Sequence, residues 1–292
     1  MTKNTVLITG INGFLGSHLA ESLSKEFDIV GLGHSDIISP RLAGFNFEVL
    51  YSLSEVKTFY KKTKIFAIIH TATVYRKNEY SVEDFILTNV LLPVQLYELA
   101  IQNRTKIFFN TDSFFNDPNW NYSYLKDYTL SKNQALKWLK YLNEDNGCKL
   151  INMKIFHMYG PYDAPNKFIP SVIEKLKNNE SSIDTTNGEQ TRDFIYVSDV
   201  VDTYKLLLGK ETKLSKYSEF DIGTGKEFSI KDTILLIKDI TNSSTKINFG
   251  KLPYRENELM KSKANIGGLL NLGWKPKFEL RDGIKNILDS EE

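Results

Sequence analysis

The octapeptide TGINGFLG, residues 9–16, decides how the whole sequence is interpreted. It lies between an apolar run typical of a strand, residues 5–9, and a segment with apolar residues at helical spacing, residues 14–27. Glycines allow a tight turn and let the backbone approach a pyrophosphate, which the unpaired N–H groups and dipole of a helix amino terminus attract. The stretch therefore predicts a dinucleotide site at the first strand-to-helix junction. Its members are Gly10, Asn12, Gly13, Phe14, Leu15 and Gly16.

Outward from this turn, short apolar runs alternate with segments of helical or polar character. The expected strands are residues 5–9, 28–32, 66–72, 106–111 and 150–156, and the segments between them are 14–27, 52–62, 90–103 and 130–147. The first helix should present Leu15, Leu19, Leu23 and Phe27 on its apolar face. Such alternation predicts an α/β fold of Rossmann type, with a doubly wound parallel sheet.

The rhythm of the sequence changes after Gly160-Pro161 to a looser mixture of loops, helices and short strands. We therefore expect a dinucleotide-binding domain over residues 1–157. Residues 158–292 should form a smaller, mainly substrate-binding α+β region, with some segments returning to the first sheet. In such folds the second region closes the ligand crevice at the carboxyl ends of the strands.

Composition excludes several function classes. The chain has 292 residues, 41% hydrophobic and 25% charged, and a net charge of +1, with the basic residues scattered, so neither nucleic acid nor an anionic membrane is an expected partner. The amino terminus runs directly into a strand-like segment, and no apolar run of about 18 residues is visible, which predicts a cytoplasmic location. The lone cysteine, Cys148, is expected to be a small buried core residue, and no cluster with metal-ligand spacing is visible, so no metal is predicted.

A tyrosine followed four residues later by a lysine occurs three times. The pairs are Tyr60 and Lys64, Tyr122 and Lys126, and Tyr128 and Lys132. Only Tyr128 opens a long helix after a strand tipped by a hydroxyl residue, Thr111. The first pair is expected on a solvated helix face. The second pair falls in an aromatic loop, and because the loop from Thr111 to Tyr128 is short, Tyr122 remains an alternative.

Thr111, Tyr128 and Lys132 together suit the reduction of a ketone by hydride. The reaction needs a hydrogen bond to the carbonyl oxygen and an acid that protonates the alkoxide. Tyrosine serves as that acid if a neighbouring ammonium brings its pKa of about 10 closer to neutral. Residues four apart share one face of a helix, so Lys132 can both tune Tyr128 and reach the cofactor ribose.

These motifs resemble the extended, nucleotide-sugar branch of the short-chain dehydrogenase/reductase superfamily, the NAD-dependent epimerase/dehydratase family. The glycine spacing, the Tyr128-x-x-Ser131-Lys132 sequence and nearly the whole length of the chain carry the likeness. The resemblance implies that Tyr128 and Lys132 also touch the cofactor. It implies the same role for a strand end beside the nicotinamide and a helix-start asparagine: Thr71, Ala72, Thr73 and Asn89.

The choice of nicotinamide cofactor depends on the end of the second strand. Relatives that use NAD carry an acid there for the ribose hydroxyls, whereas this chain has Gly33, followed by His34 and Ser35. Glycine leaves room for a 2′-phosphate and the next two side chains offer it donors, so NADP(H) is predicted over NAD. Asp36 is the rival feature.

The resemblance also implies a nucleotide-sugar substrate. Its expected contacts are Asp112, Ser113, His157, Lys167, Arg192 and Arg255, the arginines being candidates for the diphosphate. Ser113 stands where 4,6-dehydratases carry the glutamate that removes a proton, and an ordinary hydroxyl cannot take that role. The segments FFNTDSFF, NKFIP, GEQTRDFI and GWKPKF look most like those of CDP-abequose and CDP-paratose synthases. These are NADPH-dependent reductases of a CDP-4-keto-3,6-dideoxyhexose in O-antigen biosynthesis.

Two other functions remain open from the sequence. A nucleotide-sugar epimerase that retains NAD would use the same three side chains in both directions, and a regulator could bind NADP without chemistry. Residue types alone specify neither the base of the sugar nucleotide nor the C4 configuration of the product. The apolar helices around Asn89 and Tyr128 allow a homodimer, as the resemblance implies.

Overall fold

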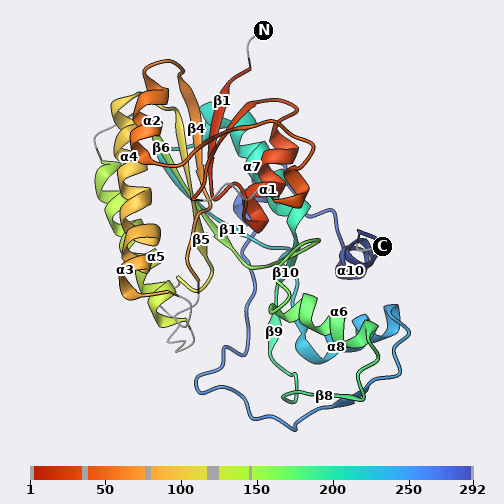
Figure 1. Cartoon of the computed structure of the whole chain (residues 1–292). Helices are drawn as coiled ribbons and strands as arrows, with labels where there is room; N and C mark the ends of the chain where they lie inside the picture. The colour runs from red at the N-terminus through yellow and green to blue at the C-terminus, as the bar shows by residue number, and fades with distance from the viewer. Residues whose placement is uncertain (1–2, 35–38, 76–79, 117–124, 145–146, 291–292) are drawn as a thin grey trace. The chain divides into compact units, whose positions relative to one another are not determined.

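A computed structural model describes residues 3–34, 39–75, 80–116, 125–144 and 147–290 (Figure 1). The chain divides into two compact units. The first contains residues 1–118, 124–154 and 201–220, and the second contains residues 119–123, 155–200 and 221–292. Ser35, Asp36 and Tyr122 lie outside the described residues, so their predicted roles stay predictions.

The predicted parallel sheet is confirmed. In the described residues it has seven strands, in the order β11-β6-β5-β4-β1-β2-β3. The strands are β1 (Thr5–Thr9), β2 (Asp28–Leu32), β3 (Glu48–Leu50), β4 (Ile65–His70), β5 (Ile107–Ser113), β6 (Lys149–Ile155) and β11 (Tyr217–Ile222). The strand order reverses direction at β1, which places the ends of β1 and β4 together at the switch point where such sheets bind ligands. Leu150 N donates to Lys216 O and Phe156 N to Ile222 O, so β11 runs parallel to β6.

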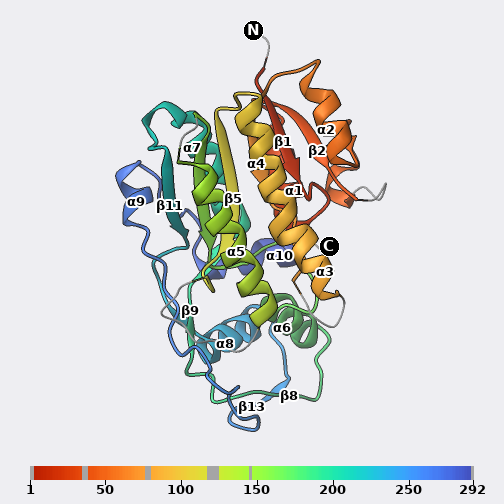
Figure 2. The same cartoon turned by 90° about the vertical axis from the view of Figure 1, so that its left-hand side faces the viewer.

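Helices cover both faces of this sheet. Helices α2 (Leu53–Tyr60), α4 (Leu92–Gln102) and α5 (Lys126–Leu142) lie on one face, and α1 (Phe14–Leu23) and α7 (Val197–Gly209) lie on the other (Figures 1 and 2). Alternate residues of β5 contact the two layers, because successive side chains of a strand point to opposite faces. The Phe108 ring packs against Tyr97 of α4 and the Phe109 ring against Tyr204 of α7, with centroids 5.1 Å and 5.4 Å apart.

The first helix is shorter than expected. Its buried face carries Leu15, Leu19 and Leu23, as predicted, but the helix ends at Leu23. Phe27 lies past its end and stacks on Phe66 of β4 instead, with centroids 6.4 Å apart. The prediction of Phe27 on the helix face was therefore wrong.

The helix before β5 is interrupted. It begins as α3 (Val82–Phe85), widens into a π-helical turn at Ile86–Leu91 and continues as α4. Together Val82–Gln102 is long and apolar enough to cross a membrane by length and composition alone, with a mean hydropathy of 1.3. Core helices of soluble proteins pass the same test, and Leu96, Tyr97 and Ala100 of this segment are fully buried in the core of the first unit.

The second unit has its own apolar core. Its helices are α6 (Phe168–Lys177), α8 (Ile230–Ile240), α9 (Gly267–Asn271) and α10 (Leu280–Ser290). Its short strands pair as β10 (Phe194–Tyr196) with β7 (His157–Tyr159), β12 (Phe228–Ser229) with β9 (Thr191–Arg192), and β13 (Lys246–Asn248) with β8 (Ser182–Asp184). The amphipathic helices α6, α8 and α10 bury their apolar faces together beneath the aromatic residues of β7 and β10.

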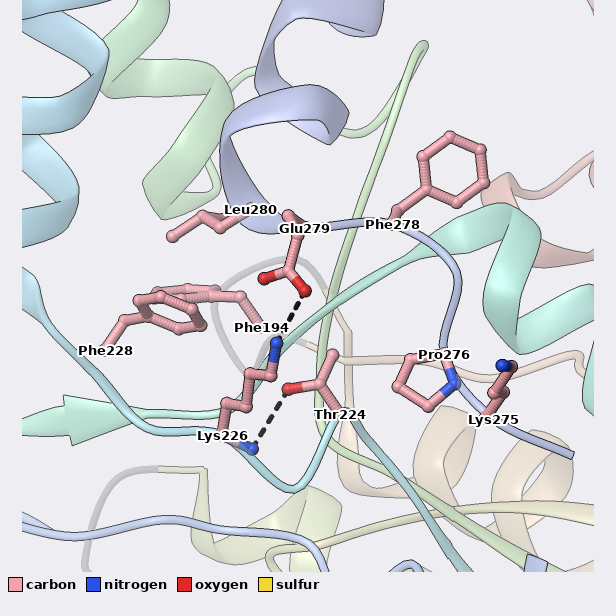
Figure 3. A pocket seen from close by; sticks show the side chains of 9 residues that line it. All are labelled: Phe194, Thr224, Lys226, Phe228, Lys275, Pro276, Phe278, Glu279 and Leu280. Atoms are coloured by element: carbon pink, nitrogen blue, oxygen red, sulfur yellow. Dashed lines mark hydrogen bonds and ion pairs between the residues drawn. The ribbon is translucent and has the colours of Figure 1, made fainter. Parts of the chain in front are cut away.

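The second unit also contains a pocket of about 250 Å³ (Figure 3). Its walls include Phe194, Phe228 and Phe278, and an ion pair between Lys226 and Glu279, 2.6 Å apart, crosses it. None of the site residues predicted from the sequence lines this pocket.

Candidate active site

The glycine-rich turn is closed by contacts that only glycine permits. Gly10 has a φ of +64° and donates its N–H to Leu32 O, while Gly13 N donates to Gly10 O. A Cβ on Gly10 would lie 2.9 Å from the backbone of Ala72, and a Cβ on Gly16 would lie 2.1 Å from Gly10 O. The turn therefore brings bare backbone to the switch point of the sheet, as a pyrophosphate site requires.

Helix α1 presents its amino terminus at the same place. Gly13 caps it without any side-chain hydrogen bond, and its first turn holds no acidic residue. No acidic side chain in this turn opposes an anion, which the positive end of the helix dipole attracts. Asn12, predicted to contact the cofactor, also makes a contact within the protein: its Oδ1 accepts a hydrogen bond from Ser39 N at 3.2 Å.

A buried hydroxyl that the sequence analysis missed joins the ends of β1 and β4. Thr9 Oγ1 accepts hydrogen bonds from Thr71 N and Ala72 N, both at 3.1 Å, and lies 2.9 Å from His70 Nδ1. With both N–H groups pointing at it, the Thr9 hydroxyl must donate its own hydrogen to His70. Burial lowers the pKa of His70 well below its usual value, so the ring is neutral and accepts that hydrogen. The contact holds the predicted cofactor residues Thr71 and Ala72 beside Gly10.

Asn89 sits in the π-helical turn and is fully buried. Its Oδ1 accepts from Val74 N and Thr73 Oγ1, and its Nδ2 donates to Val74 O and to Ser131 Oγ. The extra residue in the turn points this amide inward, where it ties the loop after β4 to helix α5. Asn89 therefore positions the predicted cofactor residue Thr73 and the helix that carries Tyr128 and Lys132.

At the end of β2, Gly33 N donates to Leu50 O at 3.0 Å, and the side chain of His34 is exposed. Ser35 and the rival Asp36 lie outside the described residues, so the preference for NADP(H) stays a prediction.

The structure places Tyr128 and Lys132 in one helix and Lys132 beside the backbone of Thr111, while the Thr111 hydroxyl contacts Tyr204 of α7. Tyr128 lies in the first turn of α5 and Lys132 one turn later, both buried. Lys132 Nζ donates to Thr111 O at 2.9 Å and lies 5.9 Å from the centroid of the Tyr128 ring. The Tyr128 hydroxyl shares a hydrogen bond with the Ser113 side chain, and the Tyr128 ring packs edge-on against Tyr75.

The pKa of Tyr128 differs from the expectation. It is raised above its usual value, chiefly because the phenol is buried and secondly because Asp112 and Tyr75 lie near, and the bond with Ser113 only partly opposes this. The predicted lowering of the pKa of Tyr128 by Lys132 was therefore wrong. Burial also lowers the pKa of Lys132 to about 8. Tyr128 is therefore held in its protonated form, the form that donates a proton to a ketone.

Asp112, predicted as a substrate contact, is held inside the protein. Its Oδ1 accepts from Ser113 N at 2.7 Å, and its Oδ2 accepts from Asn116 Nδ2 at 3.0 Å and Asn152 Nδ2 at 2.9 Å. Asn152 Nδ2 also lies 2.9 Å from Glu219 Oε2 on β11. Burial raises the pKa of Asp112, while the three donors favour its charged form. No motif in the sequence marks this chain of amides and carboxylates.

The pair of Tyr60 and Lys64 lies elsewhere. Tyr60 ends α2, but Lys64 lies beyond the helix, and Tyr60 packs on the core with its OH 2.8 Å from Thr105 Oγ1. Burial raises the pKa of Tyr60 to about 12. The expected solvated helix face was therefore wrong, because a long aromatic side chain at the end of a helix can turn back onto the sheet. The expected burial of Cys148 is confirmed, and burial raises its pKa to about 12.

The remaining predicted substrate residues belong to the second unit. His157 on β7 has its pKa lowered well below the usual value, chiefly by burial and then by Arg192, so it is neutral. Lys167 caps α6 and pairs with Asp163 Oδ1 at 2.8 Å, and Arg255 is exposed.

Arg192 is buried, and its guanidinium is occupied by groups of the protein. It donates to Thr191 O at 2.7 Å, to Leu259 O at 2.6 Å and to the Glu258 carboxylate. To bind a diphosphate, Arg192 would have to exchange or share these partners. Among the described residues no group of three or more His, Cys, Asp or Glu side chains could hold a metal ion.

The sequence is similar to those of a known family and of several known proteins. The model of the NAD dependent epimerase/dehydratase family matches residues 6–223. CDP-abequose synthase of Salmonella muenchen is 38% identical over 289 residues, covering 98% of both chains. CDP-abequose synthase of Salmonella typhimurium is 34% identical over 297 residues, again covering 98% of both chains. A putative UDP-glucose 4-epimerase of Methanocaldococcus jannaschii is 28% identical over 306 residues, 97% of both chains.

Solved structures share the fold. UDP-glucose 4-epimerase of Thermotoga maritima, with UDP-glucose, has a TM-score of 0.81 at 20% identity, covering 99% of this chain and 100% of that one. UDP-glucose 4-epimerase of Thermus thermophilus, with NAD, has a TM-score of 0.80 at 18% identity, covering 98% of both chains. At these identities the likeness is one of fold.

Proposed function

Because the chain belongs to the NAD dependent epimerase/dehydratase family and is a nucleotide-sugar oxidoreductase, we propose that it reduces the 4-keto group of a CDP-activated 3,6-dideoxyhexose with NADPH. The product would be CDP-abequose or CDP-paratose, made in the cytoplasm for O-antigen assembly. The observation that carries the proposal is the 38% identity to CDP-abequose synthase over 98% of both chains. The cluster of Thr111, Tyr128 and Lys132 supports the same chemistry.

The glycine turn and the Thr9–Thr71–Ala72 contact fit a dinucleotide, with Gly10 and Gly16 giving its pyrophosphate access to the backbone. When bound, its dihydronicotinamide supplies the hydride. Thr111 Oγ1 donates a hydrogen bond to the substrate carbonyl, which strengthens as negative charge develops on oxygen. Tyr128 then delivers its proton to that oxygen. Lys132, anchored on Thr111 O, keeps a positive charge beside the phenolate that remains.

Ser113 favours reduction over elimination. Its side chain bonds the Tyr128 hydroxyl and accepts from Phe115 N at 3.2 Å, so it is engaged as a neutral partner. A dehydratase needs a base at this place to remove a carbon-bound proton, and an ordinary serine hydroxyl does not ionise near neutral pH. Asp112, the neighbouring acid, accepts three hydrogen bonds from the protein and lies buried.

Epimerisation is the second candidate function. It is favoured by the 28% identity to a putative UDP-glucose 4-epimerase. An epimerase retains NAD through each cycle and shows no net consumption of NADPH. The cofactor content of the purified protein distinguishes the two functions, because tightly retained NAD would favour epimerisation.

The deciding experiment supplies enzymatically made CDP-4-keto-3,6-dideoxyglucose with NADPH, follows absorbance of the reduced cofactor, and determines the C4 configuration of the product by NMR. We expect stoichiometric NADPH oxidation, and slower turnover with NADH at the same concentration. Equal rates with the two cofactors would overturn the preference for NADP(H). If NADPH were oxidised only with a dTDP- or GDP-linked keto sugar, the assigned nucleotide of the substrate would change, while the proposed mechanism would stand.

The pH dependence of reduction should report on Lys132. Its pKa of about 8 means that the ammonium loses its proton as pH rises past that value, while Tyr128 stays protonated. We therefore expect kcat/KM to be constant at neutral pH and to fall above about pH 8. The Asp112 carboxylate raises the pKa of Lys132, so Asp112→Asn should move the descending limb to lower pH. A limb that stays in place would show that Asp112 carries no charge there.

We also propose a homodimer through the helices around Asn89 and Tyr128, which Figure 2 shows facing the viewer. These helices expose large apolar side chains: Val82, Ile86, Leu87, Leu91, Leu130, Trp138 and Tyr141. Trp138 is 54% exposed and Tyr141 63%. Burying such a patch favours association.

Sedimentation velocity should give a dimer for the wild type and a monomer for Trp138→Glu, because a charge placed in an apolar interface is left without a partner. Leu235→Glu is the matched control, since Leu235 is 42% exposed on α8, a helix of the second unit that carries none of the patch residues. A monomeric wild type would contradict the proposal.

A further inference from the structure

A buried tyrosine lies directly behind the predicted carbonyl-binding hydroxyl. Tyr204 OH is 2.7 Å from Thr111 Oγ1, although the two residues are 93 positions apart in the sequence. Tyr204 lies on α7 and Thr111 near the end of β5, both in the first unit. The Tyr204 ring also packs against Phe109, which shares the face of β5 with Thr111. Packing of the Tyr204 ring on Phe109 therefore holds the Tyr204 hydroxyl beside Thr111.

The direction of this hydrogen bond follows from burial. Tyr204 is 0% exposed, and burial raises the pKa of its phenol, so the hydroxyl keeps its hydrogen at any working pH. In the described part of the chain, the hydrogen-bond partner of that hydroxyl is Thr111 Oγ1. If Thr111 donated to Tyr204, the phenol hydrogen would be buried without an acceptor, which is rare and costly. If Tyr204 donates, both groups are satisfied.

We infer that Tyr204 is a positioning residue for the active site: it donates to Thr111 Oγ1 and so directs the hydrogen of Thr111 to the substrate carbonyl. This inference rests on the proposed reduction. Thr111 is partly exposed, so its hydroxyl hydrogen can point out of the protein interior toward a bound substrate. A hydroxyl that accepts one hydrogen bond becomes a stronger donor in the next, which suits stabilisation of a developing alkoxide.

The chain offers a matched control for this pair. Tyr60 OH lies 2.8 Å from Thr105 Oγ1, so it too is a tyrosine paired with a threonine hydroxyl. Tyr60 ends α2, and Thr105 also donates to Ile65 O, at the amino-terminal end of β4. That end of a parallel sheet is opposite the end that binds ligands. Tyr60→Phe therefore removes the same kind of hydrogen bond without touching the site.

The test is a double-mutant cycle of Tyr204→Phe and Thr111→Val in the reductase assay with NADPH and the CDP-4-keto sugar. Tyr204→Phe should lower kcat about 10-fold, as loss of a buried hydrogen bond predicts, with KM and the NADPH Kd little changed. In the Thr111→Val background the same substitution should have no further effect on kcat, because its target is gone. Tyr60→Phe should leave kcat at the wild-type value.

Urea unfolding of the four proteins gives a readout that needs no substrate. Thr111→Val should lower the unfolding midpoint by stranding the Tyr204 hydrogen, and adding Tyr204→Phe should move the midpoint back up. Additive losses in both kcat and midpoint would overturn the inference, as would full activity of Tyr204→Phe. An inactive wild type would instead refute the proposed function, and the unfolding cycle would still test whether the two hydroxyls are coupled.

Discussion

Replacing Tyr128 with phenylalanine is expected to lower kcat for ketone reduction by about 10³-fold, within the range that general acids contribute. The substitution removes one oxygen atom, and with it the proton donor and the bond to Ser113. The ring itself should remain in place, because it is buried and packs edge-on against Tyr75 with centroids 5.1 Å apart. Steady-state kcat with saturating NADPH measures the effect.

Cofactor binding provides the control for this variant. The glycine turn, the Thr9 hydroxyl and Asn89 are untouched by the substitution, so the NADPH Kd from fluorescence titration should stay within about threefold of the wild type, a change below about 1 kcal/mol. A Tyr128→Phe enzyme that retains substantial turnover would contradict the assignment. The acid would then have to come from another residue, and Tyr122, outside the described residues, is the alternative that the sequence leaves open.

The parts of the fold that could be predicted are those whose signal is local. Residues 5–9 and 28–32 are apolar runs bounded by polar residues, and they coincide with β1 and β2. Strand β3 is three residues long, and its existence depends on pairing with Gly31 and its neighbours. Strand β11 reads YSEFDI, half polar, and is a strand because it pairs with β6. Pairing partners distant in sequence leave no periodic pattern that would reveal such strands.

The residues of the candidate site also fall into those that local sequence could predict and those that it could not. Tyr128 and Lys132 are one helical turn apart and Thr111 lies near the end of a strand, so spacing and context sufficed to group them. The contacts of Tyr204 with Thr111 and of Asn152 with Asp112 and Glu219 join separate elements, and no local signal marks them. The pKa of Tyr128 was expected to fall because a lysine is near. It rises because burial, which spacing does not reveal, is the larger effect.

The second large effect should come from Gly16→Ala. The added Cβ would lie 2.1 Å from Gly10 O and 2.8 Å from Gly10 C, which are backbone atoms that cannot rotate away. Gly10 cannot move easily, since its φ is +64° and its N–H is bonded to Leu32 O at 2.8 Å. The turn must therefore open, and with it the backbone surface that would receive the pyrophosphate. We expect the NADPH Kd to rise about 100-fold, equivalent to about 2.7 kcal/mol.

Opening the turn should also lower the free energy of unfolding by about 1–3 kcal/mol, as overpacking does. Gly44→Ala is the matched control, because a Cβ there meets nothing within 4 Å. That variant should bind NADPH as the wild type does and gain a few tenths of a kcal/mol, since alanine restricts the unfolded chain. Circular dichroism first establishes that each variant is folded at the titration temperature. If folded Gly16→Ala bound NADPH as tightly as Gly44→Ala, the cofactor phosphates could not lie on this turn, because no arrangement of the turn accepts both the methyl group and the present backbone path.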